Sequence, residues 1–417
     1  MSLSRRKSLV LGLITISLGV GLSFALGEAA VRLMGGRDVH GTFRFRGYRI
    51  QPHRYTGEVF RADIDRFLTG EAPGVAYDPI LGWVDVVKHD GPELAPVLRS
   101  IHRDTTEYTL APVDGLLRIV LVGDSYTRSA EVGYEDSWGL ALQERLKALG
   151  IRAEVLNLGV GSYGMDQAYL RWTGQGRALR PDILLFGFQP ENLKRNMNLF
   201  RPFYTGGVGF FLSKPRFVLD GDSLTLHNVP ALEPQDIPAF VDEFWDNPLS
   251  EYEAFRRREY EFVPFWMHSR LVASTVAIWR RRVLLRNDFP ESTFFDVDSE
   301  GGRLGLKLIA QMEEEAQADS TPFVVLHLPR ARWEVIRSLR GNDIIYPALL
   351  DTIKSRHDVI DAFDALADAA REAEDPSAIH MPHGHYSALA NRVVGELAAD
   401  TLASWIRSGR LELNRLR

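Results

Sequence analysis

The sequence predicts a three-layer α/β/α domain on a parallel five-stranded sheet, with an irregular, partly β lead-in and a long insertion. Short apolar, β-branched runs alternate with longer segments of helical period, which is typical of parallel strands joined by crossover helices. The alternation begins near residue 116 and is interrupted between about residues 200 and 303. We therefore expect an apolar terminal segment over 1–34, the lead-in over 35–115, and the α/β domain over 116–417 with an insertion at about 200–303.

The amino-terminal segment combines a basic cluster at residues 5–7 with an uncharged run from Leu9 to Gly27. A helix of nineteen residues spans about 28 Å, close to the thickness of a bilayer's hydrocarbon core. The run therefore favours a retained, single-pass anchor in the inner membrane. A cleaved signal peptide is the alternative, because Ala25 and Gly27 are spaced for a signal peptidase. In both cases the basic cluster stays inside, and the rest of the chain is periplasmic or secreted.

Composition narrows the classes of partner. The 417 residues are 45% hydrophobic and 25% charged, which is ordinary for a globular protein. A formal net charge of −6 argues against nucleic acid as a partner, because phosphate binding needs a basic face. The absence of cysteine excludes thiol catalysis, zinc–thiolate sites and disulfides. We expect no cofactor.

The elements of the α/β domain follow from the apolar periodicity. Strands are expected where a short apolar run ends at a turn, and helices where apolar residues recur at helical spacing. The expected strands are 118–122, 153–158, 182–188, 322–328 and 358–360, and the expected helices are 137–149, 166–175, 307–317 and 388–407. Right-handed crossovers would bring the carboxyl ends of these strands to one edge of the sheet.

The lead-in and the insertion have no α/β rhythm. The lead-in is broken by Gly, Pro and Asp, sustains no helical period, and is expected to pack on the main domain. The insertion is expected to hold a turn-rich segment, a hairpin and two helices, at 202–215, 217–226, 253–260 and 270–286. Its arginine triplets at 256–258 and 280–282 are either solvated helix faces, the commoner role, or a site for an anionic ligand.

Four polar segments stand where chemistry is expected in an open α/β sheet. Gly123-Asp124-Ser125 directly follows the first strand, where such sheets place reactive groups. The other three are 157–164 after the second strand, 189–193 after the third, and 380–387 before the last helix. In this order, they resemble the sequence blocks of the SGNH/GDSL hydrolase family. The resemblance covers about residues 116–200 and 320–405. It implies a flavodoxin-like sheet and a serine esterase or O-acetyltransferase.

The first two blocks imply a nucleophile and an oxyanion donor. The resemblance makes Ser125 the nucleophile, whose hydroxyl needs a base to take its proton during attack. In the second block a backbone N–H stabilises the oxyanion. Counting from Asn157, that position falls on Ser162, with Gly161 just before it, so either residue is a candidate donor beside the N–H of Ser125. A turn with only a structural role is the alternative.

The third block departs from the family pattern of Gly-x-Asn-Asp. Here the chain has Glu191-Asn192. A carboxylate would repel an oxyanion, whereas an amide N–H₂ stabilises it, so Asn192 is the expected third donor. Asn196 and Asn198 are weaker candidates. An asparagine that only forms a turn is the rival interpretation.

The last block supplies a base but lacks the usual acid. The residues after His385 fit the family, which makes His385 the expected base, with His383 as the alternative. Three residues before His385, where the family has Asp, this chain has Pro382. We expect a backbone carbonyl, Asp361 or Asp364 to orient His385, because the two acids follow the presumed fifth strand.

A metal site at the three histidines of this block is not expected, because no carboxylate lies at ligand spacing in the sequence. The expected function is therefore that of an exported, membrane-anchored serine hydrolase acting on ester bonds. O-acyl, chiefly acetyl, groups of glycans are its expected substrate. One alternative is an O-acetyltransferase of cell-surface polysaccharide. A second alternative is a degenerate, non-catalytic glycan-binding protein.

Overall fold

The computed structural model describes residues 5–38, 40–71, 74–86, 109–204, 211–283 and 292–413. The chain forms two compact units. Unit 1 comprises Met1–Asp65, Pro202–Phe211 and Gln235–Pro290, and unit 2 comprises Arg66–Arg201, Leu212–Pro234 and Glu291–Arg417. The structure thus divides both the lead-in and the insertion between the two units.

Unit 2 is built on the predicted five-stranded parallel sheet. Its strands are β6 (Leu117–Gly123), β7 (Ala153–Asn157), β8 (Ile183–Phe188), β11 (Phe323–His327) and β12 (Val359–Asp361). They are arranged in the order β12-β11-β8-β6-β7, and each neighbouring pair is parallel. Counted along the chain this is the order 2-1-3-4-5 of a flavodoxin-like sheet. The predicted fold class is confirmed, with every strand bound within one residue of its expected position.

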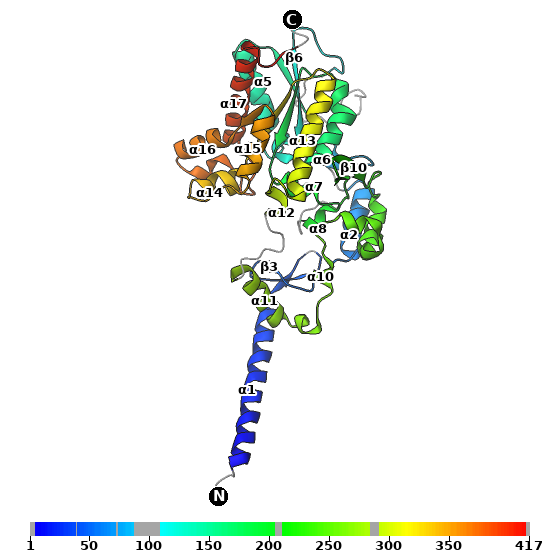
Figure 1. Cartoon of the computed structure of the whole chain (residues 1–417), viewed down its shortest axis with the longest axis vertical. Helices are drawn as coiled ribbons and strands as arrows, with labels where there is room; N and C mark the ends of the chain where they lie inside the picture. Colours follow the sequence, from blue (N-terminus) through cyan, green and yellow to red (C-terminus); the bar gives the residue numbers. More distant parts are fainter. Residues whose placement is uncertain are drawn as a thin grey trace. The chain divides into compact units, whose positions relative to one another are not determined.

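Helices cover both faces of this sheet (Figure 1). On one face, α5 (Trp138–Ala148) and α17 (Ala388–Arg407) pack together over a buried apolar cluster of the strands. On the other face, α6 (Met165–Arg171) contacts β6, and α13 (Glu300–Ala318) contacts β11. The layers are therefore α/β/α.

Shorter elements complete unit 2. Two antiparallel hairpins pair β4 (Val75–Asp78) with β5 (Gly82–Asp85) and β9 (Arg216–Asp220) with β10 (Ser223–His227). The second hairpin is the one expected in the insertion. The remaining helices are α4 (Ser125–Arg128), α7 (Asn192–Asn196), α12 (Ser292–Phe295), α14 (Ile336–Ser338), α15 (Pro347–Arg356) and α16 (Phe363–Glu372). The 3₁₀ turns are η1 (Tyr134–Asp136), η3 (Arg177–Leu179) and η9 (Pro376–Ile379), and the π-helical turns are η2 (Trp172–Gly176) and η8 (Ala331–Val335).

Unit 1 begins with the long helix α1 (Arg5–Met34), of which Lys7–Met34 is apolar and long enough to cross a membrane. A small sheet of β1 (Gly36–Arg37), β2 (Phe43–Phe45) and β3 (Tyr48–Arg49) follows. Its core joins the end of α1, the sheet and α11 (Arg270–Arg282) through Val31, Phe43, Ile50, Met267 and Ala273. The other elements are α8 (Arg201–Tyr204), η4 (Pro234–Asp236), α9 (Ile237–Asp242), η5 (Phe244–Asp246), η6 (Pro248–Tyr252), α10 (Arg258–Glu261) and η7 (Phe265–His268).

Two expectations for these regions were wrong. The lead-in contains a helix, α2 (Glu58–Leu68), which begins in unit 1 and buries Phe60 and Ile64 one turn apart. In the insertion, the helix expected over 253–260 is reduced to α10, because Arg256 turns into the interior. Its guanidinium donates to the Glu261 carboxylate and to the carbonyl of Val241, so this arginine is neither solvated nor available to a ligand.

Candidate active site

Ser125 and His385 lie together at the carboxyl edge of the sheet. Ser125 is the first residue of α4, directly after β6, and His385 lies in the turn before α17. The Nε2 atom of His385 is 2.9 Å from the Oγ atom of Ser125, although 260 residues separate them in the chain. This is hydrogen-bond distance for a base and the hydroxyl that it deprotonates.

The turn that carries Ser125 depends on close packing. A Cβ at Gly123 or at Gly187, the paired residue of β8, would collide with the side chain of Thr127. The buried carboxylate of Asp124 caps α4 by accepting the N–H of Tyr126 at 2.9 Å, and it pairs with Arg195 at 2.8 Å. Burial raises the pKa of Asp124, and the Arg195 guanidinium opposes that rise. The carboxylate thus positions the turn.

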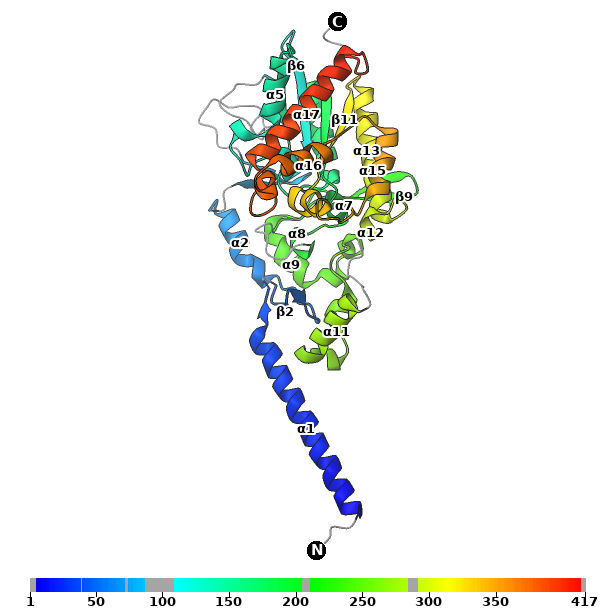
Figure 2. The same ribbon diagram turned by 90° about the vertical axis from the view of Figure 1, so that its left-hand side faces the viewer.

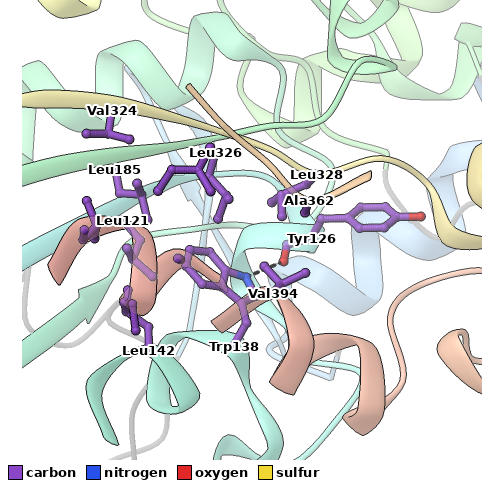
Figure 3. Packing of buried hydrophobic residues seen from close by; sticks show 14 of the residues in the cluster. Leu121, Tyr126, Trp138, Leu142, Leu185, Val324, Leu326, Leu328, Ala362 and Val394 are labelled. Carbon is purple, nitrogen blue, oxygen red and sulfur yellow. Dashed lines mark hydrogen bonds between the residues drawn. The ribbon is translucent and has the colours of Figure 1, made fainter. Parts of the chain in front are cut away.

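Tyr126 connects the nucleophile turn with the turn of the base. Its carbonyl oxygen accepts a hydrogen bond from Nε1 of the buried Trp138 at 3.0 Å, as Figure 3 shows. Its hydroxyl donates to the carbonyl of Gly384 at 3.1 Å, and its ring centroid lies 4.9 Å from that of His385. The residue after the nucleophile therefore contacts both the base and the residue before it.

The expectation of an acid behind His385 was wrong. Among the described residues, the buried Nδ1 atom of His385 has no hydrogen-bond partner, neither Asp361, Asp364 nor a backbone carbonyl. The carboxylate of Asp361 instead accepts from Nδ1 of His327 at 2.7 Å and pairs with Lys354 at 2.6 Å. Strand β12 does end at this edge of the sheet, but the neighbouring strand β11 provides the histidine that Asp361 binds.

A different carboxylate lies beside the base. Glu131, which follows α4, places Oε1 3.4 Å from Nε2 of His385, on the side of the ring that faces Ser125. Burial lowers the pKa of His385, and the negative charge of Glu131 acts against this. His385 therefore stays neutral at lower pH than an ordinary histidine. When it is protonated, the carboxylate of Glu131 lies close enough to stabilise its positive charge. Sequence reasoning missed Glu131, because nothing in the spacing links it to His385.

The second block lies against the nucleophile turn. The N–H of Val160 donates to the carbonyl of Gly123 at 3.2 Å, and the Asn157 amide donates to the carbonyl of Thr127 at 2.7 Å. Ser162 has φ of 67°, in the left-handed region that favours glycine, which fits a position where the family has Gly. The carbonyl of Gly161 accepts from Nε1 of Trp83 at 3.0 Å.

Trp83 belongs to the β4–β5 hairpin of the lead-in. It is fully buried, and its own carbonyl accepts the hydroxyl of Tyr163 at 2.6 Å. Asp85 of the same strand pairs with Arg128 of α4 at 2.8 Å. This part of the lead-in therefore packs on the α/β domain, as expected, and it supports the turn that holds Gly161 and Ser162.

The third block places Asn192 at the start of α7, where it is 1% exposed. Its side chain hydrogen-bonds Asp124, and its Oδ1 atom has no partner among the described residues. The weaker candidates have structural contacts: Asn196 accepts from the N–H of Met165 at 2.8 Å, and Asn198 donates to Phe200 at 2.9 Å. Among the three, Asn192 is the one bound to the nucleophile turn.

Glu191 does not act as an isolated charge, because Arg330 lies 2.5 Å from its carboxylate. A further amide, that of Gln189, was missed in the sequence. Gln189 follows β8 and is fully buried, and neither atom of its amide has a hydrogen-bond partner within the described ranges. Strands β6 and β8 are parallel, and Gly123 of β6 pairs with Gly187 of β8. Ser125 comes two residues after Gly123, and Gln189 comes two residues after Gly187, so both follow the same edge of the sheet. The register of the strands is the signal that would have singled it out.

The fold also brings Glu131, His383 and His385 together, with potential ligand atoms within 4.8 Å of one another. The sequence spacing had suggested no carboxylate near these histidines. Nε2 of His385 already contacts Ser125, so a cation there would compete with the serine for that nitrogen. His383, the alternative base, is exposed, and its ring centroid lies 5.3 Å from that of His385.

No family model and no curated protein matches the chain. Several solved structures are similar to it, among them proteins of the family that the motifs resemble. A G-D-S-L family protein from Desulfitobacterium hafniense DCB-2 is 15% identical with a TM-score of 0.32, over 68% of this chain and 98% of that one. The acetyl xylan esterase AlAXEase is 14% identical with a TM-score of 0.33, over 69% and 100%. A lipase/acylhydrolase from Enterococcus faecalis is 14% identical with a TM-score of 0.35, over 72% and 98%.

Proposed function

We propose that this chain is a membrane-anchored serine hydrolase that cleaves ester bonds of O-acylated glycans outside the cytoplasmic membrane. The observation that carries the proposal is the 2.9 Å contact between Oγ of Ser125 and Nε2 of His385. A histidine at this distance, at the carboxyl edge of a parallel sheet, is placed to activate a serine for attack on a carbonyl carbon.

The reaction proceeds in two halves. Oγ of Ser125 bonds to the ester carbonyl carbon while its proton moves to Nε2 of His385. The N–H groups of Ser125 and of Gly161 or Ser162, with the amide of Asn192, stabilise the oxyanion. The carbon–oxygen bond to the alcohol then breaks, and His385 gives its proton to the leaving oxygen. Water, deprotonated by His385, attacks the acyl-enzyme, and the acid leaves as Ser125 regains its proton.

Glu131 supplies the negative charge that the orienting acid gives in a serine–histidine–acid triad. Protonation of Nε2 creates an imidazolium 3.4 Å from the Glu131 carboxylate, which stabilises that charge as the tetrahedral intermediate forms. The carboxylate approaches the nitrogen that faces Ser125, so its action is electrostatic and it does not fix the tautomer. The chain therefore has a serine–histidine dyad with a lateral acid.

A pocket beside the base turn supports a glycan substrate. Its volume is about 770 Å³, and its lining includes Trp333, Arg332, Arg337, Arg340 and Pro382. Trp333 is 48% exposed, and a Cβ at Gly384 would lie 3.4 Å from its indole nitrogen, which places the ring against the turn of His385. The guanidinium of Arg332 lies over the Trp333 ring at 4.9 Å, so the rest of the exposed indole is the stacking surface for a sugar ring. Arg337 and Arg340 of the same lining provide hydrogen-bond donors.

The test is hydrolysis of 4-nitrophenyl acetate and of an acetylated oligosaccharide by the purified full chain in detergent. We expect both to be cleaved and both activities to be lost in Ser125→Ala. Trp333→Ala should lower kcat/KM for the oligosaccharide and leave that for 4-nitrophenyl acetate unchanged. A folded wild type without hydrolysis would support the non-catalytic alternative. If Trp333→Ala lowers kcat/KM equally for both substrates, the assignment of a glycan substrate is wrong, and the assignment of ester hydrolysis remains.

Acyl transfer is separated from hydrolysis by the fate of the acyl group. With a sugar acceptor present, an O-acetyltransferase would acetylate the acceptor, whereas a hydrolase releases acetate. Location is tested independently by a reporter fused after the last residue, Arg417. We expect the reporter to be active only outside the cytoplasm, because the basic cluster before the α1 run stays inside. Cytoplasmic activity would contradict the location.

A further inference from the structure

Unit 1 fixes the end of α1 against the beginning of α11. The carboxylate of Glu28 accepts hydrogen bonds from Oγ of Ser269 at 2.8 Å and from the N–H groups of Arg270 at 3.0 Å and Leu271 at 2.8 Å. A Cβ at Gly27 would lie 2.9 Å from the side chain of Leu271. The two helices are therefore joined at the residue where the uncharged run of α1 ends, and both views show them side by side (Figures 1 and 2).

Large apolar side chains are exposed just before α11 and near its C-terminal end. Just before α11, Phe262 is 62% exposed, Phe265 88% and Trp266 48%, and within α11, Trp279 is 49% exposed. Soluble surfaces rarely gather apolar groups of this size in one region. Trp and Phe at this density are typical of segments that lie at the boundary between a membrane and water.

A basic cluster completes the surface. Arg280, Arg281 and Arg282 form the last turn of α11, and Arg281 also lies over the ring of Tyr48 at 5.6 Å. Helix α11 packs on the core of unit 1 through Val272, Ala273 and Val276. Guanidinium groups next to exposed aromatic rings match the phosphates and the acyl boundary of a phospholipid leaflet.

We propose that η7 and α11 form a membrane-interface segment, defined by residues 262–282, that lies in the headgroup region of the leaflet through which α1 leaves the bilayer. This inference rests on the proposed anchoring by α1. The nineteen-residue uncharged run ends at Gly27, so Glu28 and the α11 N-terminus that it caps lie at headgroup depth. Phe265 and Trp266, whose rings are exposed, come a few residues before the N-terminus of α11.

The absence of cysteine allows a direct test in the full chain. Single cysteines replace Phe265 and Trp279, carry a nitroxide label, and are compared with Leu18→Cys in α1 and with Glu58→Cys, whose side chain is 80% exposed in the same unit. The proteins are placed in vesicles of phosphatidylethanolamine and phosphatidylglycerol. Accessibility to oxygen, which concentrates in lipid, and to a water-soluble nickel chelate then gives the depth of each label.

We expect a high oxygen-to-nickel ratio at position 18, an intermediate ratio at 265 and 279, and a low ratio at 58. A lipid ratio at 18 with an aqueous ratio at both 265 and 279 would overturn the interface and leave the anchor standing. An aqueous ratio at 18 would overturn the anchor and the interface together. Labels at 265 and 279 that are shielded from both probes would indicate a protein contact, such as a second copy, and would also overturn the proposal.

A second variant tests the basic cluster and leaves the exposed aromatic residues unchanged. Arg280→Gln, Arg281→Gln and Arg282→Gln are combined in the Phe265→Cys chain. In vesicles containing phosphatidylglycerol, the oxygen-to-nickel ratio at 265 should fall toward that measured in neutral phosphatidylcholine vesicles. An unchanged ratio would exclude attraction to anionic headgroups. Circular dichroism and the Tm of each variant serve as the control for folding, because all of the substituted positions lie in unit 1.

Discussion

The hydroxyl of Tyr126 donates a hydrogen bond to the carbonyl oxygen of Gly384 across 258 residues of chain. Tyr126 follows the nucleophile directly, and Gly384 precedes the base directly. One contact between their neighbours therefore helps to set the distance between Ser125 and His385. Burial raises the pKa of Tyr126 well above its ordinary value, so the phenol remains a donor over the working range of pH.

Tyr126→Phe should lower kcat by about fivefold, the equivalent of ~1 kcal/mol for one buried neutral hydrogen bond. The ring contacts with His385 would remain, and only the bond to Gly384 would be lost. Steady-state cleavage of 4-nitrophenyl acetate measures the effect. A variant with unchanged kcat and lowered Tm would show that the bond serves stability alone.

His385→Ala should abolish ester cleavage, because nucleophile and base act as one unit. His383→Ala is the matched control: this residue is exposed and has no contact with Ser125 among the interactions of the described residues. It should keep most of the activity. Loss of activity in His383→Ala, with His385→Ala still active, would exchange the two assignments.

Glu131→Gln should move the acid limb of kcat/KM to lower pH. His385 acts as a base only when neutral, above its pKa, and burial already holds that pKa below its ordinary value of 6.5. The negative charge of Glu131 raises the pKa, so removing it lowers the pKa further and keeps the base neutral in more acidic solution.

The same variant should lower kcat about five- to tenfold, or ~1 to 1.4 kcal/mol, because the imidazolium loses a partly exposed neighbour. A pH–rate profile of wild type and variant checks both effects. A shift of the acid limb to higher pH would contradict the role assigned to Glu131.

Asn192→Ala should lower kcat by about 10²–10³ with little change in KM, the usual scale for one oxyanion donor. Asn196→Ala is the control, since its Oδ1 accepts a backbone N–H of α6 and its loss should lower Tm. If Asn192→Ala retains activity while Gln189→Leu loses it, the donor is the buried amide of Gln189.

Ser162→Gly should raise Tm and preserve kcat. The φ of 67° costs a non-glycine residue about 1 kcal/mol, and the substitution keeps the backbone N–H, which is one of the two proposed for the oxyanion with that of Gly161. Ser162→Ala keeps the strain, so it should give no gain in Tm. A fall in kcat for both variants would show that the hydroxyl takes part in the reaction.

Local pattern was sufficient for the sheet but not for the site. Buried parallel strands are continuous apolar runs, so β6, β8 and β11 could be located from the sequence to within one residue. The juxtaposition of Ser125 with His385 followed from strand order and the motifs. Glu131 could not be found this way, because its approach to His385 depends on how the chain turns after α4.

The division into units was also beyond local pattern. Residues 35–65 of the lead-in and 235–290 of the insertion belong to one unit, joined by long-range contacts such as the hydrogen bond from the N–H of Gly57 to the carboxylate of Asp242. Helix α2 was missed because its charged residues obscure an apolar stripe of only two buried side chains. Asp361 was misassigned because an acid at the correct edge of the sheet can be bound by a different histidine.

The carboxylate of Glu28 has a consequence for maturation of the chain. Cleavage after Gly27 requires the peptide bond to enter a protease in extended form, yet in the folded protein that bond lies within α1, between a residue packed on Leu271 and one that caps α11. Cleavage of the Gly27–Glu28 bond and the folding of unit 1 therefore exclude each other. Once α11 has docked, the bond is held in helical form, so cleavage after Gly27 would have to precede the folding of unit 1.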